Sequence, residues 1–178
     1  MGEWDAYYDA LAGRPVRELF SRALRVMART TPGRALDLGC GDGTETRALL
    51  TAGWHVVAID RELDAESRIL AGVPDELRGR LEVVIADLPT VPLPPADLVY
   101  AGLSLFFVDP PRFPLLWVAV RAALRPGGVL AVNLMGVNDS WAGEGCKARA
   151  SSSTGAWSAE GRGRDSHRGG ASGADPRS

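Results

Sequence analysis

Short hydrophobic runs alternate with amphipathic stretches along most of the chain. Runs rich in Val, Ile, Leu and Ala, most of which end close to an acidic residue or a glycine, predict β-strands. Apolar residues between and before these runs recur at helical spacing, which predicts helices. The predicted strands are residues 35–38, 56–60, 81–87, 96–101 and 128–134, and the predicted helices are residues 15–28, 45–52, 64–71 and 112–124.

Strands that alternate with helices in this way predict βαβ units. The expected fold is therefore α/β, with a doubly wound, mostly parallel sheet that is covered by helices on both faces. Sheets of this kind bind ligands at the carboxyl ends of their strands. We therefore expect the functional residues in the loops that follow the strands.

The alternating pattern stops at Trp141. Residues 142–178 contain no Val, Ile, Leu, Met, Phe or Tyr and are dominated by Gly, Ser, Ala and Arg. Such a segment cannot bury enough apolar surface to offset its chain entropy, which predicts a disordered tail after a domain of residues 1–141. The chain has a single lysine, Lys147, and no glutamine, a bias typical of GC-rich coding sequence. The tail is therefore interpreted either as an out-of-frame product beginning near residues 143–146 or as an authentic flexible segment.

Composition narrows the classes of partner. The 178 residues are 46% hydrophobic and carry a formal net charge of −2, which fits one domain with a real core and argues against a nucleic-acid surface built on bulk positive charge. We expect a small-molecule partner and no nucleic acid. The chain shows no secretory leader and no long apolar run, so we expect a cytoplasmic protein without a membrane span. Cys40 and Cys146 lack ligand or disulfide spacing, so neither a metal site nor a disulfide is expected.

A glycine-rich loop, Asp-Leu-Gly-Cys-Gly-Asp-Gly-Thr at residues 37–44, follows the first predicted strand and opens a helix. Glycines in this context let a backbone approach a ligand closely. A dinucleotide-binding fingerprint would read G-x-G-x-x-G, but Thr44 stands at its third glycine and Gly43 comes one residue early. The loop therefore predicts a ligand site and weakens the interpretation as a nicotinamide-binding site.

Acidic residues border this loop and follow two further strands. Asp37 and Asp42 flank the glycines, and negative charge there suits a cationic ligand better than a pyrophosphate. S-adenosylmethionine carries a sulfonium and an ammonium and has no phosphate. Asp60 can accept ribose hydroxyls, while Asp87 can accept an adenine amine with Leu88 covering the ring. The alternative is that Asp60 caps the helix near residue 64 and Asp87 caps the next turn.

Taken together, D-x-G-x-G-x-G, the acids Asp60 and Asp87, and Leu-Arg-Pro-Gly-Gly at 124–128 resemble the class I S-adenosylmethionine-dependent methyltransferases over residues 4–141. The chain is most similar to their small-molecule branches, including those like tellurite-resistance methyltransferases. The resemblance implies a Rossmann-like fold, S-adenosyl-L-methionine as cofactor, and methyl transfer to a small molecule. The cofactor-binding residues it implies are Asp37, Gly39, Cys40, Gly41, Gly43, Asp60, Arg61, Asp87 and Leu88.

The chain departs from this family after its fifth strand. Family members continue with another helix and an antiparallel strand pair, and the tail supplies neither. The resemblance therefore implies a sheet that lacks its last strands and leaves an apolar edge.

Aromatic residues near the N-terminus form a second candidate site. Trp4, Tyr7 and Tyr8 are interpreted either as a lid over the cofactor or acceptor, or as a hydrophobic plug. His55 begins a predicted strand, away from the edge that builds the site, and is expected to be structural.

The segment Phe-Val-Asp-Pro-Pro-Arg-Phe at 107–113 resembles the D-P-P-[YF] motif of nucleic-acid amino methyltransferases. It lies too far beyond the fourth strand, and Arg112 holds the place of the aromatic residue. Asp109 as a helix N-cap, with Pro110 and Pro111 in the first turn, explains these residues more simply.

Three hypotheses of function remain. The first is a methyltransferase for a small molecule, in which no catalytic residue is assigned because alignment with a sulfonium leaving group supplies much of the catalysis. The second is a non-catalytic, truncated relative that retains only the cofactor pocket. The third is an NAD-dependent oxidoreductase, against which Thr44 and Asp87 argue.

Overall fold

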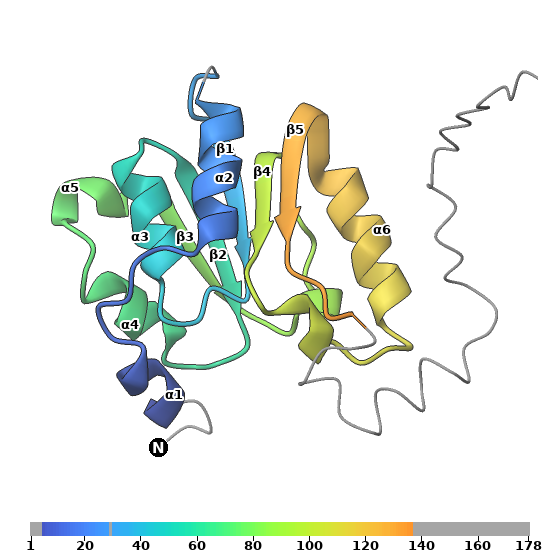
Figure 1. The fold of residues 1–178 in the computed structure, drawn as a ribbon, viewed down its shortest axis with the longest axis horizontal. Helices are drawn as coiled ribbons and strands as arrows, with labels where there is room; N and C mark the ends of the chain where they lie inside the picture. The colour runs from blue at the N-terminus through green and yellow to red at the C-terminus, as the bar shows by residue number, and fades with distance from the viewer. Residues whose placement is uncertain (1–4, 29, 137–178) are drawn as a thin grey trace, which may run out of the picture. The chain divides into compact units, whose positions relative to one another are not determined.

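The computed structural model describes residues 5–28 and 30–136. These residues form a five-stranded sheet in the order β3-β2-β1-β4-β5, in which every pair of neighbours is parallel. Figure 1 shows the sheet with its helices. The strands are β1 (Arg34–Leu38), β2 (His55–Asp60), β3 (Leu81–Ile85), β4 (Ala96–Ala101) and β5 (Leu124–Val132). The predicted α/β fold with a parallel sheet is confirmed. Trp4 and the predicted tail at 142–178 lie outside the described residues.

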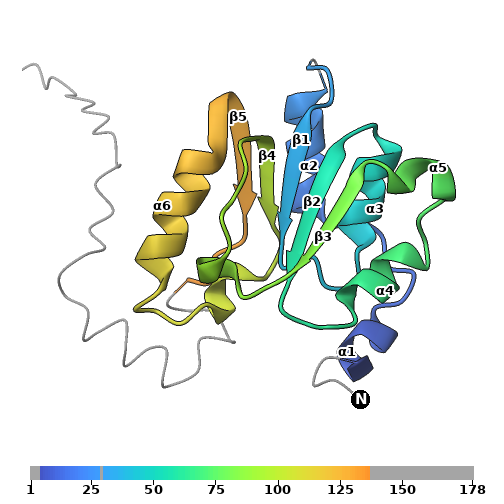
Figure 2. The same cartoon turned by 180° about the vertical axis from the view of Figure 1, so that it is seen from behind.

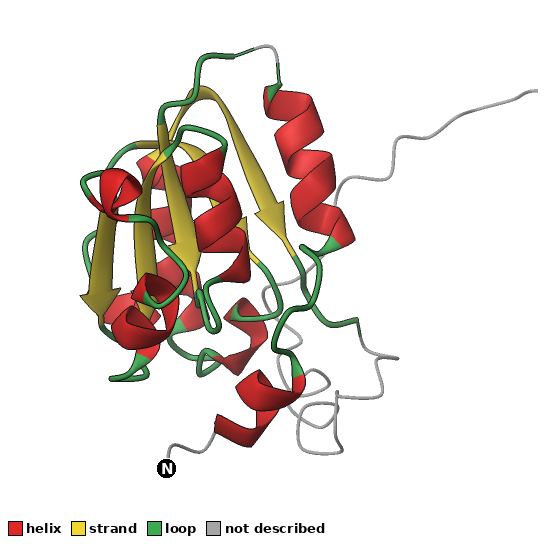
Figure 3. Ribbon diagram, turned by 90° about the vertical axis from the view of Figure 1, so that its left-hand side faces the viewer, coloured by secondary structure: helices red, strands yellow, loops and turns green. Residues whose placement is uncertain are grey.

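Helices cover both faces of the sheet, as Figures 2 and 3 show. The α-helices are α1 (Asp5–Ala10), α2 (Glu18–Met27), α3 (Thr44–Thr51), α4 (Ala65–Leu70), α5 (Asp75–Arg78) and α6 (Phe113–Ala123). Short 3-10 helices, η1 (Leu88–Thr90) and η2 (Leu105–Phe107), follow β3 and β4. No helix in the described part of the chain is long and apolar enough to cross a membrane.

The core consists of two hydrophobic clusters, one on each face of the sheet. Alternate residues of a strand point to opposite faces, so Ala35 of β1 belongs to the cluster under α2, α3 and α4, while Leu36 belongs to the cluster under α6. Phe20 and Leu116, from α2 and α6, are buried in these clusters. This double cover explains why the strands are nearly continuous hydrophobic runs.

One predicted helix start and one predicted helix N-cap are wrong. The first long helix, α2, begins at Glu18 rather than Pro15, because the backbone stays extended at Arg17, whose amide donates to the Glu45 carboxylate at 3.0 Å. Helix α6 has Arg112 at its N-cap position, and no side chain caps it. Asp109 contributes its backbone carbonyl, which accepts the amides of Arg112 and Phe113 at 2.8 and 3.1 Å.

Strand β5 forms one edge of the sheet. Within the described residues it pairs with β4 alone, and it begins at Leu124 rather than at the predicted residue 128. An outer strand needs backbone hydrogen bonds on one side only, so the strand accommodates Pro126 and Gly127 near its start.

Candidate functional site

The site lies where β1 and β4 are neighbours at the centre of the sheet. From β1 the sheet continues through β2 to β3, whereas from β4 it continues to β5. This is the point of a doubly wound sheet at which the loops after two adjacent strands diverge and leave a crevice for a ligand. The glycine loop, residues 39–43, follows β1 directly at this point.

Backbone contacts hold the glycine loop so closely that a residue with a side chain cannot replace Gly39. The amides of Gly39 and Cys40 both donate to the carbonyl of Ile59 at the end of β2, at 2.7 and 3.2 Å. Gly39 has φ +73°, and a Cβ added there would lie 2.3 Å from the Cβ of Ser104. The Ser104 hydroxyl in turn donates to the carbonyl of Leu38 at 2.5 Å. The loop therefore requires glycine for its backbone conformation and for its close approach to the segment after β4.

Asp37 is a buried carboxyl group beneath the glycine loop. Its side chain accepts a hydrogen bond from the Thr46 hydroxyl at 2.6 Å, and the residue is 2% exposed. Burial raises the pKa of Asp37 to about 7, although the hydrogen bond from Thr46 opposes this shift. Asp37 therefore exchanges its proton near neutral pH, and a cation bound close by would favour the ionised form.

Asp60 ends β2 and supports the same loop. Its two carboxylate oxygens accept the amides of Gly41 and Glu62, at 2.8 and 3.0 Å. The interpretation of Asp60 as a cap of the following helix is wrong, because α4 begins after Asp64 without a side-chain cap. Each oxygen of Asp60 keeps a further lone pair, so the carboxylate can still accept hydroxyl donors from a ligand.

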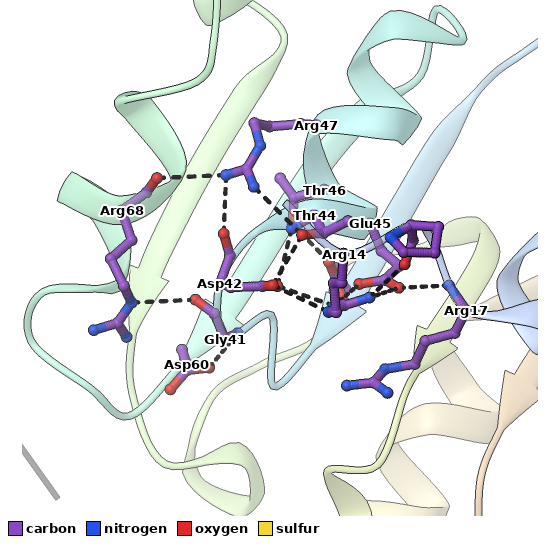
Figure 4. A network of polar contacts seen from close by, with 12 residues as sticks. Arg14, Arg17, Gly41, Asp42, Thr44, Glu45, Thr46, Arg47, Asp60 and Arg68 are labelled. Atoms are coloured by element: carbon purple, nitrogen blue, oxygen red, sulfur yellow. Dashed lines mark hydrogen bonds and ion pairs between the residues drawn. The ribbon is translucent and has the colours of Figure 1, made fainter. Parts of the chain in front are cut away.

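Arg14 joins the segment before α2 to the loop, as Figure 4 shows. Its guanidinium donates to both oxygens of Asp42, at 3.1 and 3.0 Å, and to both oxygens of Glu45, at 2.7 and 2.6 Å. Burial raises the pKa of Asp42, but hydrogen bonds from Thr44 and the charge of Arg14 outweigh it and hold that pKa below its ordinary value. Asp42 and Glu45 therefore share a single cationic partner within the protein, the guanidinium of Arg14.

Most acidic residues at the carboxyl edge of the sheet form an ion pair with an arginine. Asp87 pairs with Arg112 at 2.6 Å, Glu62 with Arg61 at 3.4 Å, and Asp64 with Arg68. Within residues 5–28 and 30–136, Asp37 and Asp60 have no ion-pair partner. These two carboxyl groups beside the glycine loop are therefore the ones that no protein cation contacts.

Tyr8 of α1 lies over the glycine loop. A Cβ added to Gly41 would lie 3.0 Å from the Tyr8 ring, and the Arg68 guanidinium stands 4.3 Å from the ring centroid in a cation–π contact. Burial and the neighbouring Asp60 raise the pKa of the Tyr8 hydroxyl, which stays protonated at neutral pH. The Tyr7 ring meets the Tyr8 ring edge to face with centroids 5.7 Å apart. The structure thus brings Tyr8 to the loop and packs Tyr7 against Tyr8.

The remaining predicted residues lie along the same edge. Strand β3 pairs with β2 with Ile85 opposite Asp60, so Asp87 follows a strand adjacent to the one that Asp60 ends. Asp87 places its carboxylate on Arg112, while its backbone carbonyl accepts the Thr90 amide in the next turn. Its carboxylate therefore does not cap that turn. Leu88 is buried in the cluster under α6.

Arg61 and Cys40 differ in exposure. Arg61 has a half-exposed side chain beyond β2. Cys40 is a buried free thiol, and burial raises its pKa, so it is not a reactive thiolate.

No cluster of potential metal ligands is present in the described part of the chain.

Several site residues have no signal in the sequence pattern. Arg14 and Arg17 precede a helix at positions that neither a motif nor periodicity marks, and Thr46 reads as an ordinary first-turn residue. Of these residues, Ser104 alone could have been predicted from its position, because it follows β4 at the carboxyl edge of the sheet, where ligands bind. The residues that sequence reasoning missed are Arg14, Arg17, Glu45, Thr46, Arg68, Ser104 and Arg112.

The residues present fit S-adenosylmethionine. Two acids without a protein cation flank the loop, which favours a ligand with positive charge and hydroxyl donors over one with a pyrophosphate. A parallel sheet with this loop and these acids defines a Rossmann-like domain of the S-adenosylmethionine-binding class.

Comparison with known proteins identifies the family. The family described as methyltransferase domain matches residues 35–128, and the chain belongs to it. The cofactor of this family is S-adenosylmethionine. A trans-aconitate 2-methyltransferase from Methylobacterium nodulans is 36% identical over 142 residues, which are 75% of this chain and 50% of that relative. The chain thus spans about half the length of the curated relatives it matches.

Other relatives show the breadth of the family. A probable ribosomal RNA small subunit methyltransferase A from Methanospirillum hungatei is 32% identical over 50% of this chain and 35% of its own length. The glycopeptide N-methyltransferase MtfA complexed with S-adenosylmethionine is 26% identical with a TM-score of 0.55, covering 71% of this chain and 63% of that one. TehB from Haemophilus influenzae, at 17% identity and a TM-score of 0.60, covers 72% of this chain and 44% of that one and shares the fold.

Proposed function

We propose that this chain is an S-adenosylmethionine-dependent methyltransferase that acts on a small molecule. The observation that carries the proposal is the pair of acids Asp37 and Asp60. Both border the glycine loop at the carboxyl edge of the sheet, and neither has a cationic partner in the described part of the chain. A sulfonium and an ammonium would supply the charge that these acids lack.

The proposal gives each neighbouring residue a role in holding the cofactor. Asp60 would accept the ribose hydroxyls, Asp87 the adenine amine, and Leu88 and Arg61 would cover the adenine ring. The backbone of Gly39, Cys40 and Gly41 would admit the amino-acid part beside Asp37. These roles match the order of the residues along the edge, from β1 through β2 to β3.

The cofactor, when bound, supplies an electrophilic methyl group on a sulfonium that is already a good leaving group. The protein then needs to align the acceptor with that methyl group and to exclude water. Tyr8 lies over Gly41 in the folded chain, and in this proposal it would exclude water from the loop.

The small-molecule acceptor is supported by the trans-aconitate 2-methyltransferases among the relatives and by the formal net charge of −2. A nucleic-acid substrate would call for a basic surface to neutralise phosphates. The ribosomal RNA methyltransferase among the relatives makes RNA the alternative acceptor that the experiment must include.

A second candidate function is cofactor binding without methyl transfer. The observation in its favour is that the chain spans about half of its curated relatives, while β5 pairs on one side only in the described residues. In this interpretation residues 1–141 form the cofactor domain and a complete acceptor site is absent.

Two measurements test the proposal. In calorimetric titration with S-adenosylmethionine, S-adenosylhomocysteine and NAD, we expect binding of the first two and none of NAD. Transfer of a labelled methyl group is then measured with trans-aconitate, a panel of small carboxylic acids and bulk RNA. Binding with transfer to a small acid supports the methyltransferase, and binding without any transfer supports the second candidate. Tighter binding of NAD would overturn both.

A further inference from the structure

A cavity with basic side chains lies at the edge of the sheet that is opposite to the glycine loop. Its volume is about 150 Å³, and the residues that line it include Arg34, His55 and Arg80. Arg34 and His55 begin β1 and β2, and Arg80 directly precedes β3. Figure 2 shows these three strands side by side. The cavity is therefore at the amino edge of the sheet, where the parallel strands begin.

The sheet register holds the three basic residues in one row. Arg34 lies opposite His55 in the pair of β1 and β2. Leu81 lies opposite Val56 in the pair of β2 and β3, so the preceding residues, Arg80 and His55, are level with each other. The Arg80 carbonyl accepts the Val56 amide at 2.8 Å, which fixes this register. Neighbouring strands are about 5 Å apart, so the strand order brings together three basic residues that are distant in the sequence.

Most donors of this row are unused by the protein. Among the described residues, the His55 and Arg80 side chains make no hydrogen bond or ion pair, and Arg34 donates once, to the carbonyl of Pro95 at 3.2 Å. The Arg80 guanidinium lies at the turn before β2, with Nη1 4.0 Å from a Cβ built on Gly53. A guanidinium has five N–H donors, and an imidazole has at least one in either protonation state. The cavity therefore offers donors to a ligand that accepts hydrogen bonds.

The lining of the cavity has a net positive charge. Among the described residues that line it, Glu82 is the one acidic residue, against two arginines. Asp97, whose carboxylate accepts the Arg34 amide at 2.9 Å, is engaged by Arg125 at 2.7 Å and does not line the cavity. A positive site attracts a dianion more strongly than a monoanion. A phosphate group carries a charge of about −1.5 to −2 at neutral pH and three acceptor oxygens, so it fits this lining better than a carboxylate.

We propose that this cavity binds the phosphate group of a small molecule through Arg34, His55 and Arg80. The planar guanidinium of arginine donates to two phosphate oxygens at once, and such charge-assisted hydrogen bonds are strong. Strand β2 runs from His55 to Asp60, which separates the cavity from the glycine loop by roughly 16 Å at about 3.3 Å per residue. The bound phosphate is therefore neither the cofactor nor the methyl acceptor, and the inference does not rest on the proposed function.

An NMR titration of the full chain measures the binding. The probes are inorganic phosphate and glycerol 3-phosphate, and potassium chloride at equal ionic strength is the control. We expect saturable shifts, largest at the His55 imidazole and at the amides of Arg80 and Leu81, that chloride does not reproduce. Tighter binding of glycerol 3-phosphate would identify a phosphate ester as the ligand, whereas equal affinities would show that the phosphate group alone is recognised.

Substitutions of exposed residues test the assignment in both directions. Arg80→Gln should weaken phosphate binding about 5- to 20-fold, because charge-assisted donors are lost. Glu82→Gln should tighten it about two- to fivefold, because a like charge is removed. Arg78→Gln is the matched control, since Arg78 pairs with Asp75 at 3.1 Å and does not line the cavity. The control should change the affinity less than about twofold, because salt screens exposed charges.

Four outcomes would overturn the proposal. The first is a set of shifts that do not saturate or that chloride reproduces. The second is equal weakening in Arg80→Gln and Arg78→Gln, which would show attraction by general charge. The third is saturable binding centred on the glycine loop. The fourth is binding of an RNA oligonucleotide through Arg80 while both small phosphates fail to bind, which would make this edge a nucleic-acid surface.

Discussion

Arg14 and Glu45 form a bidentate ion pair that joins the segment before α2 to the first turn of α3. Two parallel hydrogen bonds of 2.7 and 2.6 Å connect the guanidinium to the carboxylate, whose side chain is 5% exposed. The hydrogen bond to Glu45, followed by its charge and that of Asp42, raises the pKa of Arg14 against the effect of burial. The pair fixes the N-terminal segment on the glycine loop.

Arg14→Gln should therefore destabilise the fold strongly. The substitution leaves Asp42 and Glu45 close together without a cation, and removing one partner of a largely buried pair costs about 3 to 5 kcal/mol. Urea denaturation measures the loss, and Arg22→Gln on the exposed side of α2 is the matched control. A loss in Arg14→Gln no greater than that of the control would contradict the importance of the pair.

Gly39→Ala should cost more stability than Gly127→Ala. Both glycines have φ in the left-handed region, at +73° and +79°. A Cβ at Gly39 would collide with Ser104, whereas one at Gly127 meets nothing within 4 Å. Gly127→Ala should thus cost only the backbone strain of about 1 to 2 kcal/mol, and Gly39→Ala should cost that amount plus the collision. Thermal melts compare the stability of the two variants. Equal losses of stability would mean that the segment at Ser104 moves away from the added Cβ without a cost in free energy.

The stability of the chain should depend on the proton of Asp37. Its pKa is about 7 in the folded chain against an ordinary value of 3.8, so the folded chain binds the proton more tightly. This contribution to the free energy of unfolding is complete below pH about 4 and declines as pH rises to about 7, by roughly 4 kcal/mol at most. Asp37→Asn should remove this decline and be more stable than the unchanged chain at pH 8. Urea denaturation of the variant and of the unchanged chain at pH 5.5 and pH 8 checks both expectations. If the stability of the variant declines with pH as much as that of the unchanged chain, the decline comes from other titratable groups.

Substitutions of Tyr8 distinguish the interpretation of the N-terminal aromatic residues as a lid from their interpretation as a hydrophobic plug. If Tyr8 is a lid, Tyr8→Ala should release S-adenosylhomocysteine faster by about 3- to 10-fold, since the ring over Gly41 and its contact with Arg68 are lost. Tyr8→Phe keeps the ring and should behave like the unchanged chain. Stopped-flow displacement measures the rates. A Tyr8→Ala variant with a lower melting temperature and an unchanged release rate would show a plug.

The sequence predicted the sheet well because each buried strand reads as a continuous apolar run. Strand 96–101 was predicted with its observed bounds, while the start of the first long helix was wrong by a few residues. That error has a tertiary cause, since Glu45, distant in sequence, accepts the Arg17 amide and keeps the backbone extended there. Helix propensity and proline preference cannot register such a contact.

The acids of the candidate site were found because they follow strands, but their partners were not. Asp60 was visible at the end of an apolar run, whereas its bond to the Gly41 amide depends on how two loops meet. Arg112 was weighed within a proline motif, yet the structure places it on Asp87. Side-chain pairings between distant segments depend on how the chain packs, and they produce no periodic pattern in the sequence.

The contact between Gly39 and Ser104 also sets the order in which the site can form during synthesis. The Ser104 hydroxyl and the Leu38 carbonyl that it binds are 66 residues apart in the chain. A ribosome adds about 5 to 20 residues per second, so the glycine loop waits on the order of seconds for the segment that shapes it. Ligand binding therefore cannot assist the folding of the first half of the chain, and a nascent chain stalled before Ser104 should not retain S-adenosylhomocysteine.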